Sequence, residues 1–164
     1  MNGKLNIRVA DEKDIDATWE IFKDVIHDGD TYVYPTNTSR NEFEKIWFTD
    51  NINTYVAEFD DVIIGSFIIK DNQPGLGSHI ANASYMVHSQ YRGNQIGLAM
   101  GEYSLIEAKE LGYKAMQFNI VVKSNVSALQ LWEKLGFQII GEIPNAFQHK
   151  ELGLTNGYIL YRKL

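Results

Sequence analysis

The sequence predicts an α/β protein with a mixed sheet and helices on both of its faces, and three observations support this class. Short β-rich runs with alternating apolar residues are interspersed with segments in which apolar residues recur at helical spacing. Their predicted order is strand, helix, helix, three strands, helix, strand, helix and two strands, so neither type forms a separate block. The chain has 164 residues, of which 45% are hydrophobic, and no change of composition divides it. We therefore expect one domain over residues 1–164, large enough to bury a core.

In the amino-terminal half, each element is predicted from its periodicity and from the residues at its ends. An aromatic-rich loop over 29–38 separates two helices, and Ser39 with Glu42 forms a capping box at the start of the second one. Asp60-Asp61 lies between two β-rich runs that predict a hairpin, although the favoured Asn-Gly or Asp-Gly turn is missing. The first helix is expected over 15–26, and the strands of this half over 5–9, 54–59, 62–70 and 79–88.

The carboxy-terminal half alternates strands and helices, which predicts two crossovers that join parallel strands. A helix follows the turn at 89–97, and Leu111-Gly112 ends it because glycine readily adopts the left-handed conformation of a helix cap. Gly136 ends the next helix in the same way. That second helix is expected over 125–135, and the strands over 115–122, 137–143 and 158–162.

Composition and charge exclude several classes of protein. The chain has no cysteine, so disulfides, thiolate metal sites and a cysteine nucleophile are excluded. Lys and Arg number 15 against 21 Asp and Glu, so the basic surplus typical of nucleic-acid binding is missing. Residues 1–6 carry no apolar signal segment, no run approaches the ~20 apolar residues that cross a bilayer, and no spacing resembles a metal site or a serine nucleophile elbow. We therefore expect a cytoplasmic protein with no nucleic acid, membrane or metal partner.

A glycine-bearing turn between a strand and a helix is the first candidate for a binding site. A helix amino terminus presents unpaired N–H groups and a partial positive charge, which suit a pyrophosphate. Gly93 and Gly97 would let a ligand approach the backbone, and the Arg92 guanidinium can pair with phosphate oxygens. Two glycines also fit an ordinary strand-to-helix turn, so this turn alone leaves both interpretations open.

Two motifs around this turn carry a resemblance to a known family. The run Val87–Ala99 resembles motif A of the GNAT superfamily of acyl-CoA N-acyltransferases. Arg92 and Gly97 stand at matching positions, and Gln95 stands where the family usually has its middle glycine. Asn125–Phe137 resembles motif B of the same superfamily. Within it, the sequence is most similar to the subgroup that contains fungal enzymes acetylating azetidine-2-carboxylate and proline analogues.

The resemblance implies a GNAT fold, in which a mostly antiparallel sheet has two splayed central parallel strands and acetyl-CoA lies between them as co-substrate. A bulge in the first of these strands would aim a main-chain N–H group at the thioester oxygen. Asn125 would contact the coenzyme arm or cap its helix, and the two roles are compatible. The resemblance places Met86, Val87 and His88 along the pantetheine arm, and Arg92, Gly93, Asn94, Gln95, Ile96, Gly97 and Leu98 at the pyrophosphate.

Two asparagines in apolar strands are the catalytic candidates. Asn82 lies in the strand before the glycine turn, and Asn119 lies in the strand over 115–122. A buried amide without a partner costs roughly 1–3 kcal/mol. We therefore expect the two amides either to satisfy main-chain groups at the splay or to align the acceptor amine with the thioester. Segments 29–32 and 79–84 carry the likeness to the fungal subgroup, and on that likeness the pair orients the substrate.

Aromatic and histidine side chains supply the remaining candidates. Tyr32 and Tyr34 would wall the acceptor site or, equally, anchor the core. Trp132 stands where many family members carry a tyrosine that protonates the departing CoA thiolate, and an indole cannot act as an acid near neutral pH. Its position on an amphipathic helix is typical of core packing. His79 and His88 are available as a general base, or as ordinary residues at the ends of a strand.

The expected function is direct transfer of acetyl from acetyl-CoA to the amine of a small molecule, such as an amino or cyclic imino acid, without a covalent enzyme intermediate. A protein N-terminal acetyltransferase is an alternative within the same class, and it would need an open groove instead of a closed pocket. A noncatalytic acyl-CoA-binding regulatory module is the alternative outside catalysis. Because dimers are common in the family, the resemblance also allows a homodimer.

Overall fold

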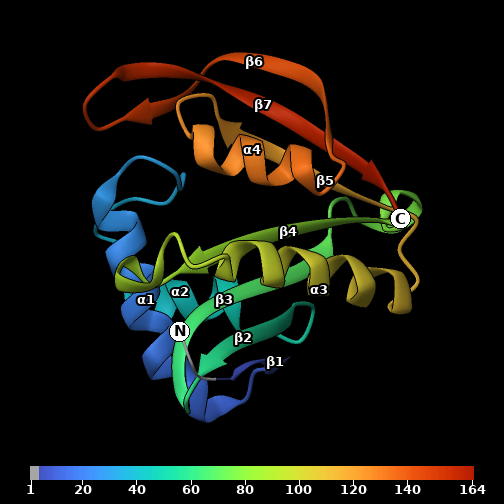
Figure 1. The fold of residues 1–164 in the computed structure, drawn as a ribbon. Coiled ribbons are helices and arrows are strands. Elements are labelled where there is room, and N and C mark those ends of the chain that lie inside the picture. The colour runs from blue at the N-terminus through green and yellow to red at the C-terminus, as the bar shows by residue number, and fades with distance from the viewer. Residues whose placement is uncertain (1–3) are drawn as a thin grey trace.

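The computed structural model describes residues 4–164. Their seven strands form one sheet in the order β1-β2-β3-β4-β5-β7-β6 (Figure 1). The element order agrees with the sequence-based prediction, and the mixed α/β class is confirmed. The α-helices in these residues are α1 (Ile15–Asp28), α2 (Arg40–Trp47), α3 (Ile96–Glu110) and α4 (Val126–Lys134). The strands are β1 (Leu5–Val9), β2 (Asn53–Phe59), β3 (Val62–Asp71), β4 (Ile80–Val87), β5 (Ala115–Val122), β6 (Gln138–His149) and β7 (Gly153–Lys163).

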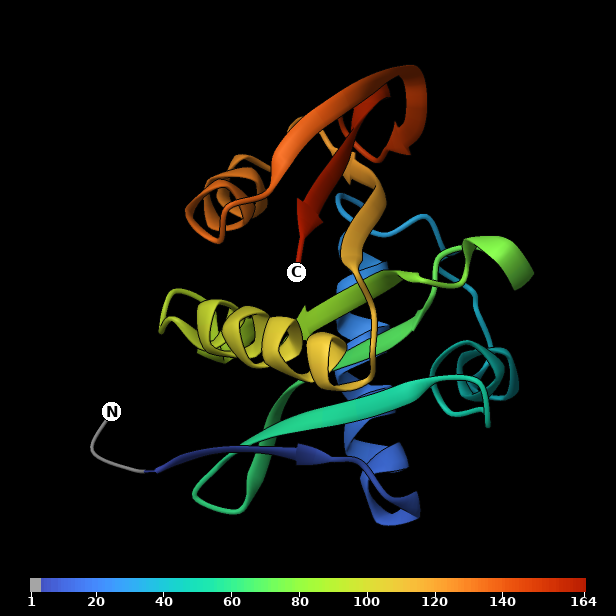
Figure 2. The same ribbon diagram turned by 90° about the vertical axis from the view of Figure 1, so that its right-hand side faces the viewer.

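The central strands β4 and β5 are parallel and separate soon after they begin. They pair only through Ile80 with Ala115 and Ala81 with Met116, although each strand has eight residues. Every other neighbouring pair in the described sheet is antiparallel. Figure 2 shows β5, β6, β7 and α4 as a layer set apart from β1 to β4. The expected splay of the central strands is therefore present.

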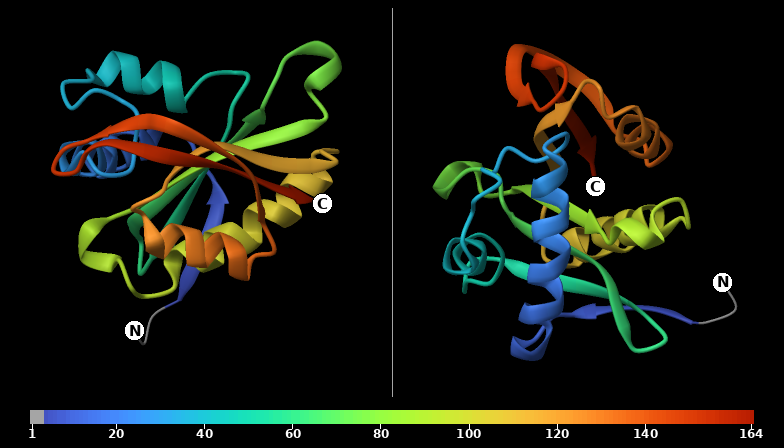
Figure 3. Two further views of the ribbon diagram at one scale, coloured as in Figure 1. Left: turned by 90° about the horizontal axis from the view of Figure 1, so that it is seen from above. Right: turned by 90° about the vertical axis from the view of Figure 1, so that its left-hand side faces the viewer.

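The helices cover both faces of the sheet, as expected. α1 crosses one face of β1 to β4, and α3 lies against the opposite face (Figures 2 and 3). The buried residues form two core clusters. In one, apolar residues of α1 and α2 pack on Ile68 and Met86. In the other, Met100 of α3 packs with Phe67 and Phe118. This arrangement places the splay between two layers of helices. Within residues 4–164, no helix has the length and apolar character needed to cross a bilayer.

α3 and α4 approach each other closely at Gly101. A Cβ atom at this position would overlap Leu135 Cδ1 and would lie 3.3 Å from Trp132 Cζ3. Leu135 and Trp132 are both buried, so neither can easily turn away. The glycine therefore sets the distance between the two helices that follow the splayed strands.

The predicted β2–β3 hairpin is confirmed, and its turn explains how it forms without glycine. Asp60 and Asp61 have φ angles of 49° and 64°, so both lie in the left-handed region. A two-residue hairpin turn with positive φ at both positions matches the right-handed twist of the flanking strands. Aspartate tolerates this conformation better than most residues with a side chain, which makes the Asp-Asp pair adequate here.

The β6–β7 hairpin is longer than the sequence predicts. The predicted strands 137–143 and 158–162 are extended to Gln138–His149 and Gly153–Lys163. The predicted first strand stops just before Pro144, and proline lacks the N–H donor of a regular strand residue. Instead, the register shifts between Ile143 and Phe147, and Asn145 in this segment has a φ of 52°. The irregularity accommodates the proline, and pairing resumes beyond it.

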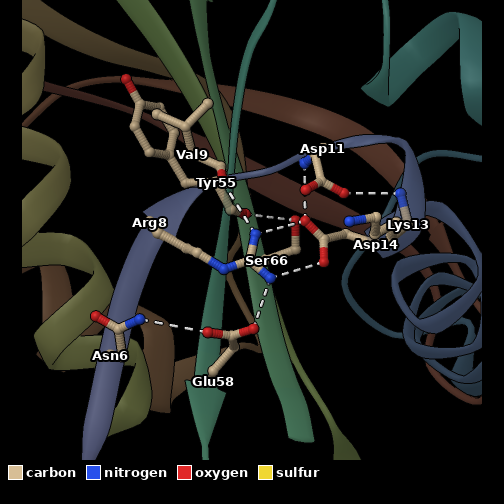
Figure 4. A network of polar contacts seen from close by, with 9 residues as sticks. All are labelled: Asn6, Arg8, Val9, Asp11, Lys13, Asp14, Tyr55, Glu58 and Ser66. Carbon is tan, nitrogen blue, oxygen red and sulfur yellow. Dashed lines mark hydrogen bonds and ion pairs between the residues drawn. The ribbon is translucent and has the colours of Figure 1, made fainter. Parts of the chain in front are cut away.

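A polar network ties the start of α1 to strands β1 and β2 (Figure 4). The Arg8 guanidinium donates to both carboxylate oxygens of Asp14, at 2.7 and 2.8 Å, and to Glu58 at 2.5 Å. Asp14 also accepts the backbone N–H of Asp11 at 2.8 Å. Asp14 is 3% exposed, and the hydrogen bonds from Arg8 lower the pKa of its carboxyl group below the usual value. The network therefore satisfies a buried charge where the chain enters the first helix.

Candidate active site

The splay between β4 and β5 opens into a cleft of about 500 Å³. Its walls come from the loop after α1, from β3, β4 and β5, and from the start of α4. All four residues predicted to act on the acceptor line this cleft: Tyr32, Tyr34, Asn82 and Asn119. Of the predicted coenzyme residues, Met86, Val87, Arg92 and Asn125 line it as well. Predictions from separate segments of the sequence therefore meet in one place.

The glycine turn after β4 leaves backbone donors unpaired at the amino terminus of α3. Among residues 4–164, none accepts a hydrogen bond from the backbone N–H groups of 93–98. A Cβ on Gly93, whose φ is 80°, would have no atom within 4 Å, so the space above the turn is open. Unpaired donors and open space suit a bound anion. This turn therefore fits the pyrophosphate of acetyl-CoA.

The conformation of Gln95 explains why the family usually has a glycine at this position. Gln95 has a φ of 62°, in the left-handed region that favours glycine. Its side chain does not cap α3. The turn therefore keeps its shape without the middle glycine, but at a cost in backbone strain. Packing does not require glycine at position 97, because a Cβ there would make an ordinary contact of 3.4 Å with Leu131 Cδ2 of α4.

Arg92 and His88 make local contacts on either side of the turn. Arg92 Nη2 donates to Asp28 Oδ2 at the end of α1, at 3.0 Å, and both side chains are about half exposed. His88 Nδ1 accepts the backbone N–H of Gln90 at 3.2 Å, so its ring caps the short 3₁₀ helix Ser89–Tyr91. His79 is exposed and does not line the cleft. The direct contacts of His88 are thus structural.

The free edge of β4 presents main-chain groups to the cleft. The carbonyl oxygen of Tyr85 accepts a hydrogen bond from Tyr32, whereas the N–H of His88 is bonded to Ile64 O in β3, at 2.8 Å. Because successive residues of a strand direct their main-chain groups to opposite sides, Tyr85 and Val87 face the cleft. The β3–β4 register continues without a shift. The bulge implied by the family resemblance is therefore not present in this pairing, and regular strand geometry exposes the Tyr85 N–H instead.

The two predicted asparagines are connected through Gln117 of β5. Asn82 Nδ2 donates to the main-chain oxygen of Gln117 at 3.0 Å, and Gln117 Nε2 donates to Asn119 Oδ1 at 3.0 Å. Asn82 therefore satisfies a main-chain group at the point where the strands separate, as one of the two expectations held. Each amide has one polar atom left, and both side chains line the cleft. The structural and the acceptor-binding roles are compatible.

Tyr32 and Tyr34 both wall the cleft and anchor the core. Their rings lie 6.4 and 5.5 Å from the ring of Phe22, measured between centroids. Tyr32 also donates its hydroxyl hydrogen to Tyr85 O at 2.7 Å. Burial raises the pKa of the Tyr32 hydroxyl well above its usual value, so this group stays protonated and able to donate at neutral pH.

Trp132 forms part of an aromatic cluster at the cleft. Its ring centroid lies 4.7 Å from that of Tyr85 and 4.6 Å from that of Phe118, and the residue is 7% exposed. These contacts support the packing role predicted for it. The neighbouring Asn125 caps α4, because its side-chain oxygen accepts the N–H of Ala128 at 3.2 Å. The capping role of Asn125 is thus confirmed, and its contact with the coenzyme stays a prediction.

Sequence reasoning missed two residues at the site, Lys70 and Gln117. Lys70 lies opposite Asn82 in the β3–β4 register and lines the cleft. Its only signal in the sequence was a charge at the end of an apolar run. Gln117 became visible only through its bonds to both asparagines. In residues 4–164, no group of three or more His, Cys, Asp or Glu side chains is placed to hold a metal ion.

The sequence matches the acetyltransferase (GNAT) family over residues 17–137. It is 30% identical over 148 residues to the N-acetyltransferase aca1 of Schizosaccharomyces pombe, with 80% of this chain and 71% of that protein covered. A GCN5-related N-acetyltransferase from Kribbella flavida is similar in structure, with a TM-score of 0.94, 34% identity and 98% of both chains covered. A phosphinothricin acetyltransferase from Sinorhizobium meliloti, solved in complex with acetyl-CoA, has the same fold, with a TM-score of 0.86, 22% identity, and 100% of this chain and 89% of that chain covered.

The family match covers most of the chain and includes both the glycine turn and the strands that form the cleft. The open turn, with its unpaired donors, fits the pyrophosphate of acetyl-CoA. This chain therefore belongs to the GNAT acetyltransferase family and is an acetyl-CoA-dependent N-acetyltransferase.

Proposed function

We propose that this enzyme acetylates the amine of a small molecule, an amino acid or cyclic imino acid. The observation that carries the proposal is that hydrogen bonds hold the loop on the acceptor side of the cleft at two points. The loop after α1 is bonded to β4 through Tyr32, and to the tip of the β6–β7 hairpin through the N–H of Lys150, which donates to Gly29 O at 3.1 Å. Figure 1 shows this tip beside the loop. A hollow of about 650 Å³ remains between the loop and the hairpin, so the preference for a small acceptor rests on this fixed wall and on the volume of the cleft.

The volume of the cleft also favours a small acceptor. The cleft of about 500 Å³ lies within the range typical of sites for single small ligands. It has to hold the pantetheine arm as well as the acceptor. The room that remains suits a compact amine better than a polypeptide chain.

Acetyl-CoA supplies a thioester carbonyl that an amine can attack directly. We assign the Tyr85 N–H, on the free edge of β4, as the main-chain donor to the thioester oxygen, because it faces the cleft together with the Tyr85 carbonyl. Val87 is the next residue whose main-chain groups face the same way. Such fixed donors stabilise negative charge that develops on a carbonyl oxygen during acyl transfer.

The Asn82–Gln117–Asn119 chain aligns the acceptor with the thioester. Holding the amine near the carbonyl carbon converts an encounter in solution into a reaction within one complex. As the nitrogen–carbon bond forms and the carbon–sulfur bond breaks, the amine loses one proton to water and the thiolate departs. With a reference pKa near ~8.5 for a comparable thiol, the thiolate can leave without an enzymatic acid. Trp132 therefore needs no acidic role.

The remaining coenzyme contacts follow the glycine turn. Arg92 and the backbone donors of 93–98 would hold the pyrophosphate, and Asn125 would contact the coenzyme arm from the start of α4. Met86 lines the cleft through its side chain, whereas the N–H of His88 is already engaged by β3. We therefore propose Val87 as the main pairing position for the pantetheine.

A thiol-release assay tests the proposal. Acetyl-CoA is incubated with amino acids, cyclic imino acids, polyamines, aminoglycosides and short peptides, and the products are identified by mass spectrometry. We expect acetylation within the amino and imino acids. Acetylation of peptide amino termini alone would contradict the small-molecule assignment. Tight acetyl-CoA binding without turnover on any of these amines would contradict it as well.

A further inference from the structure

We propose that Lys70 binds a carboxylate of the acceptor. The enzyme is thereby restricted to amines that carry a carboxylate group, such as α-amino and α-imino acids. The inference rests on the proposed function and adds the chemical group that the site recognises. Lys70 lies on β3 directly opposite Asn82 of β4. Residues that face each other in an antiparallel pair point to the same side of the sheet, so both side chains belong to one wall of the cleft.

The face of the sheet on which Lys70 and Asn82 lie follows from the alternation of side chains along each strand. Ile68 and Met86 pack against α1 on the same face, and Lys70 and Asn82 continue that face where the apolar contacts with α1 end. The acceptor loop with Tyr32 lines the same cleft. Lys70 is therefore on the acceptor side, separate from the glycine turn at the end of β4.

Lys70 differs from Arg92, the other cation of the cleft, in its ion pairing. The charged residues that line the cleft are Asp30, Lys70 and Arg92. Arg92 pairs with Asp28 and belongs to the coenzyme side. In the part of the chain that the structure describes, Lys70 takes part in none of the ion pairs. Lys70 is partly buried where it lines the cleft, and an acceptor carboxylate would supply an anion to pair with its ammonium group.

The two asparagines present complementary polarities. Because Asn82 Nδ2 is used by the main-chain oxygen of Gln117, its Oδ1 is left to accept a hydrogen bond. Because Asn119 Oδ1 is used by Gln117 Nε2, its Nδ2 is left to donate one. These orientations follow from the hydrogen-bond network. Lys70 and Asn119 thus offer donors that suit a carboxylate, and Asn82 offers an acceptor that suits the N–H of an amine.

Matched acids and amides test the assignment with the intact enzyme at saturating acetyl-CoA. The probes are L-proline with L-prolinamide, L-azetidine-2-carboxylic acid with its amide, and L-alanine with L-alaninamide. The amides have less basic amines, so a larger share is neutral and reactive at neutral pH. A preference for the acids therefore has to come from recognition. We expect kcat/KM to be about 10- to 100-fold higher for the acids, the range of one charge-assisted hydrogen bond.

Substitution of Lys70 attributes the preference to this residue. Lys70→Met should raise KM for the acids about 10- to 100-fold, leave kcat within about twofold, and leave the amides unchanged. Lys70→Arg should restore part of the preference. Lys109→Met, at an exposed lysine of α3, is the matched control. Circular dichroism and acetyl-CoA affinity by calorimetry verify that each variant is folded and binds its co-substrate.

The outcomes separate this inference from the proposed function. If acids and amides react equally, or if Lys70→Met keeps the preference of the parent, the Lys70 assignment is wrong while small-molecule acetylation stands. If only amines without a carboxylate are acetylated, such as polyamines, the assignment is wrong as well. If no small amine reacts although acetyl-CoA binds, both proposals fail.

Discussion

The Tyr32 hydroxyl donates a hydrogen bond to the main-chain carbonyl oxygen of Tyr85, with an oxygen–oxygen distance of 2.7 Å. This contact joins the acceptor loop to the free edge of β4, where the main chain faces the cleft. It fixes the loop at the place where the acceptor and the thioester have to meet. The loop therefore forms part of the candidate site and is held there by its hydrogen bond to β4.

Removal of this hydroxyl tests the contact. Tyr32→Phe should lower the free energy of unfolding by about 1 kcal/mol, the typical net value of one such hydrogen bond. Tyr34→Phe is the control, because Tyr34 packs on the same Phe22 ring and its hydroxyl makes no hydrogen bond to the described residues 4–164. Urea unfolding compares the two. Equal losses for both variants would show that the hydrogen bond contributes nothing specific.

Backbone strain at Gln95 gives a second prediction. Because a residue with a side chain pays roughly 1–2 kcal/mol in the left-handed region, Gln95→Gly should raise the free energy of unfolding by about 1 kcal/mol. Gln95→Ala keeps the strain and should change stability little. Thermal or urea unfolding provides the measurement. A glycine variant less stable than the alanine variant would show that the positive φ of Gln95 carries no strain.

The contact between α3 and α4 predicts opposite effects at two glycines of one helix. Gly101→Ala should destabilise the protein by about 1–3 kcal/mol, because the added methyl group overlaps Leu135 in a buried layer. At Gly97 a Cβ makes an ordinary contact of 3.4 Å, so Gly97→Ala should be neutral or stabilise the helix by up to about 1 kcal/mol. Stability similar to the parent in the Gly101 variant would mean that the helices can separate without loss.

Acid stability should depend on Asp14. The hydrogen bonds from Arg8 lower the pKa of Asp14 in the folded state, below the unfolded value of about 3.9. The pair therefore contributes its full stability above the unfolded pKa, and this contribution is lost as the pH falls through the folded pKa. Asp14→Asn should cost about 1.5–3 kcal/mol at pH 7, and this difference from the parent should shrink below about pH 4.

Urea unfolding at a series of pH values measures this dependence. Asp16→Asn is the control, because Asp16 lies in the first turn of α1, two residues after Asp14, and its carboxylate pairs with Arg40 in an exposed position. Exposed ion pairs contribute little, so this variant should follow the parent at every pH. A constant difference between Asp14→Asn and the parent from pH 7 to pH 3 would contradict the linkage.

Local patterns in the sequence predicted the elements and several of their ends. The Ser39 and Glu42 capping box and the Asn125 cap are present where they were expected, because each depends on residues three positions apart. The strand over 115–122 was predicted with its observed bounds. The predicted strand over 137–143 was too short, because a single sequence does not reveal the register shift beyond Ile143 after which pairing resumes.

The residues of the candidate site were also predicted only in part, because a single sequence does not reveal the register of the strands. Asn82 and Asn119 stood out as polar residues in apolar strands, and the fold brings them to one cleft. Lys70 and Gln117 did not stand out, because their roles depend on which strand lies opposite and on which face each side chain points. Gly101 was passed over because its need for a small side chain comes from α4, which is distant in sequence. Register and tertiary contacts decide all three cases.

In the proposed mechanism, the polar chain through Asn82 and Asn119 positions the acceptor while the glycine turn binds the co-substrate. Steady-state kinetics of Asn119→Ala, with the acetyl-CoA dissociation constant from calorimetry, test this division most directly. Asn41→Ala, at an exposed position of α2, is the control. We predict that kcat/KM for the acceptor falls at least about tenfold, as expected for the loss of one hydrogen bond to a charged group of the acceptor, while acetyl-CoA affinity stays within about twofold of the parent. Unchanged acceptor kinetics, or an equal loss of acetyl-CoA affinity, would contradict this division of roles.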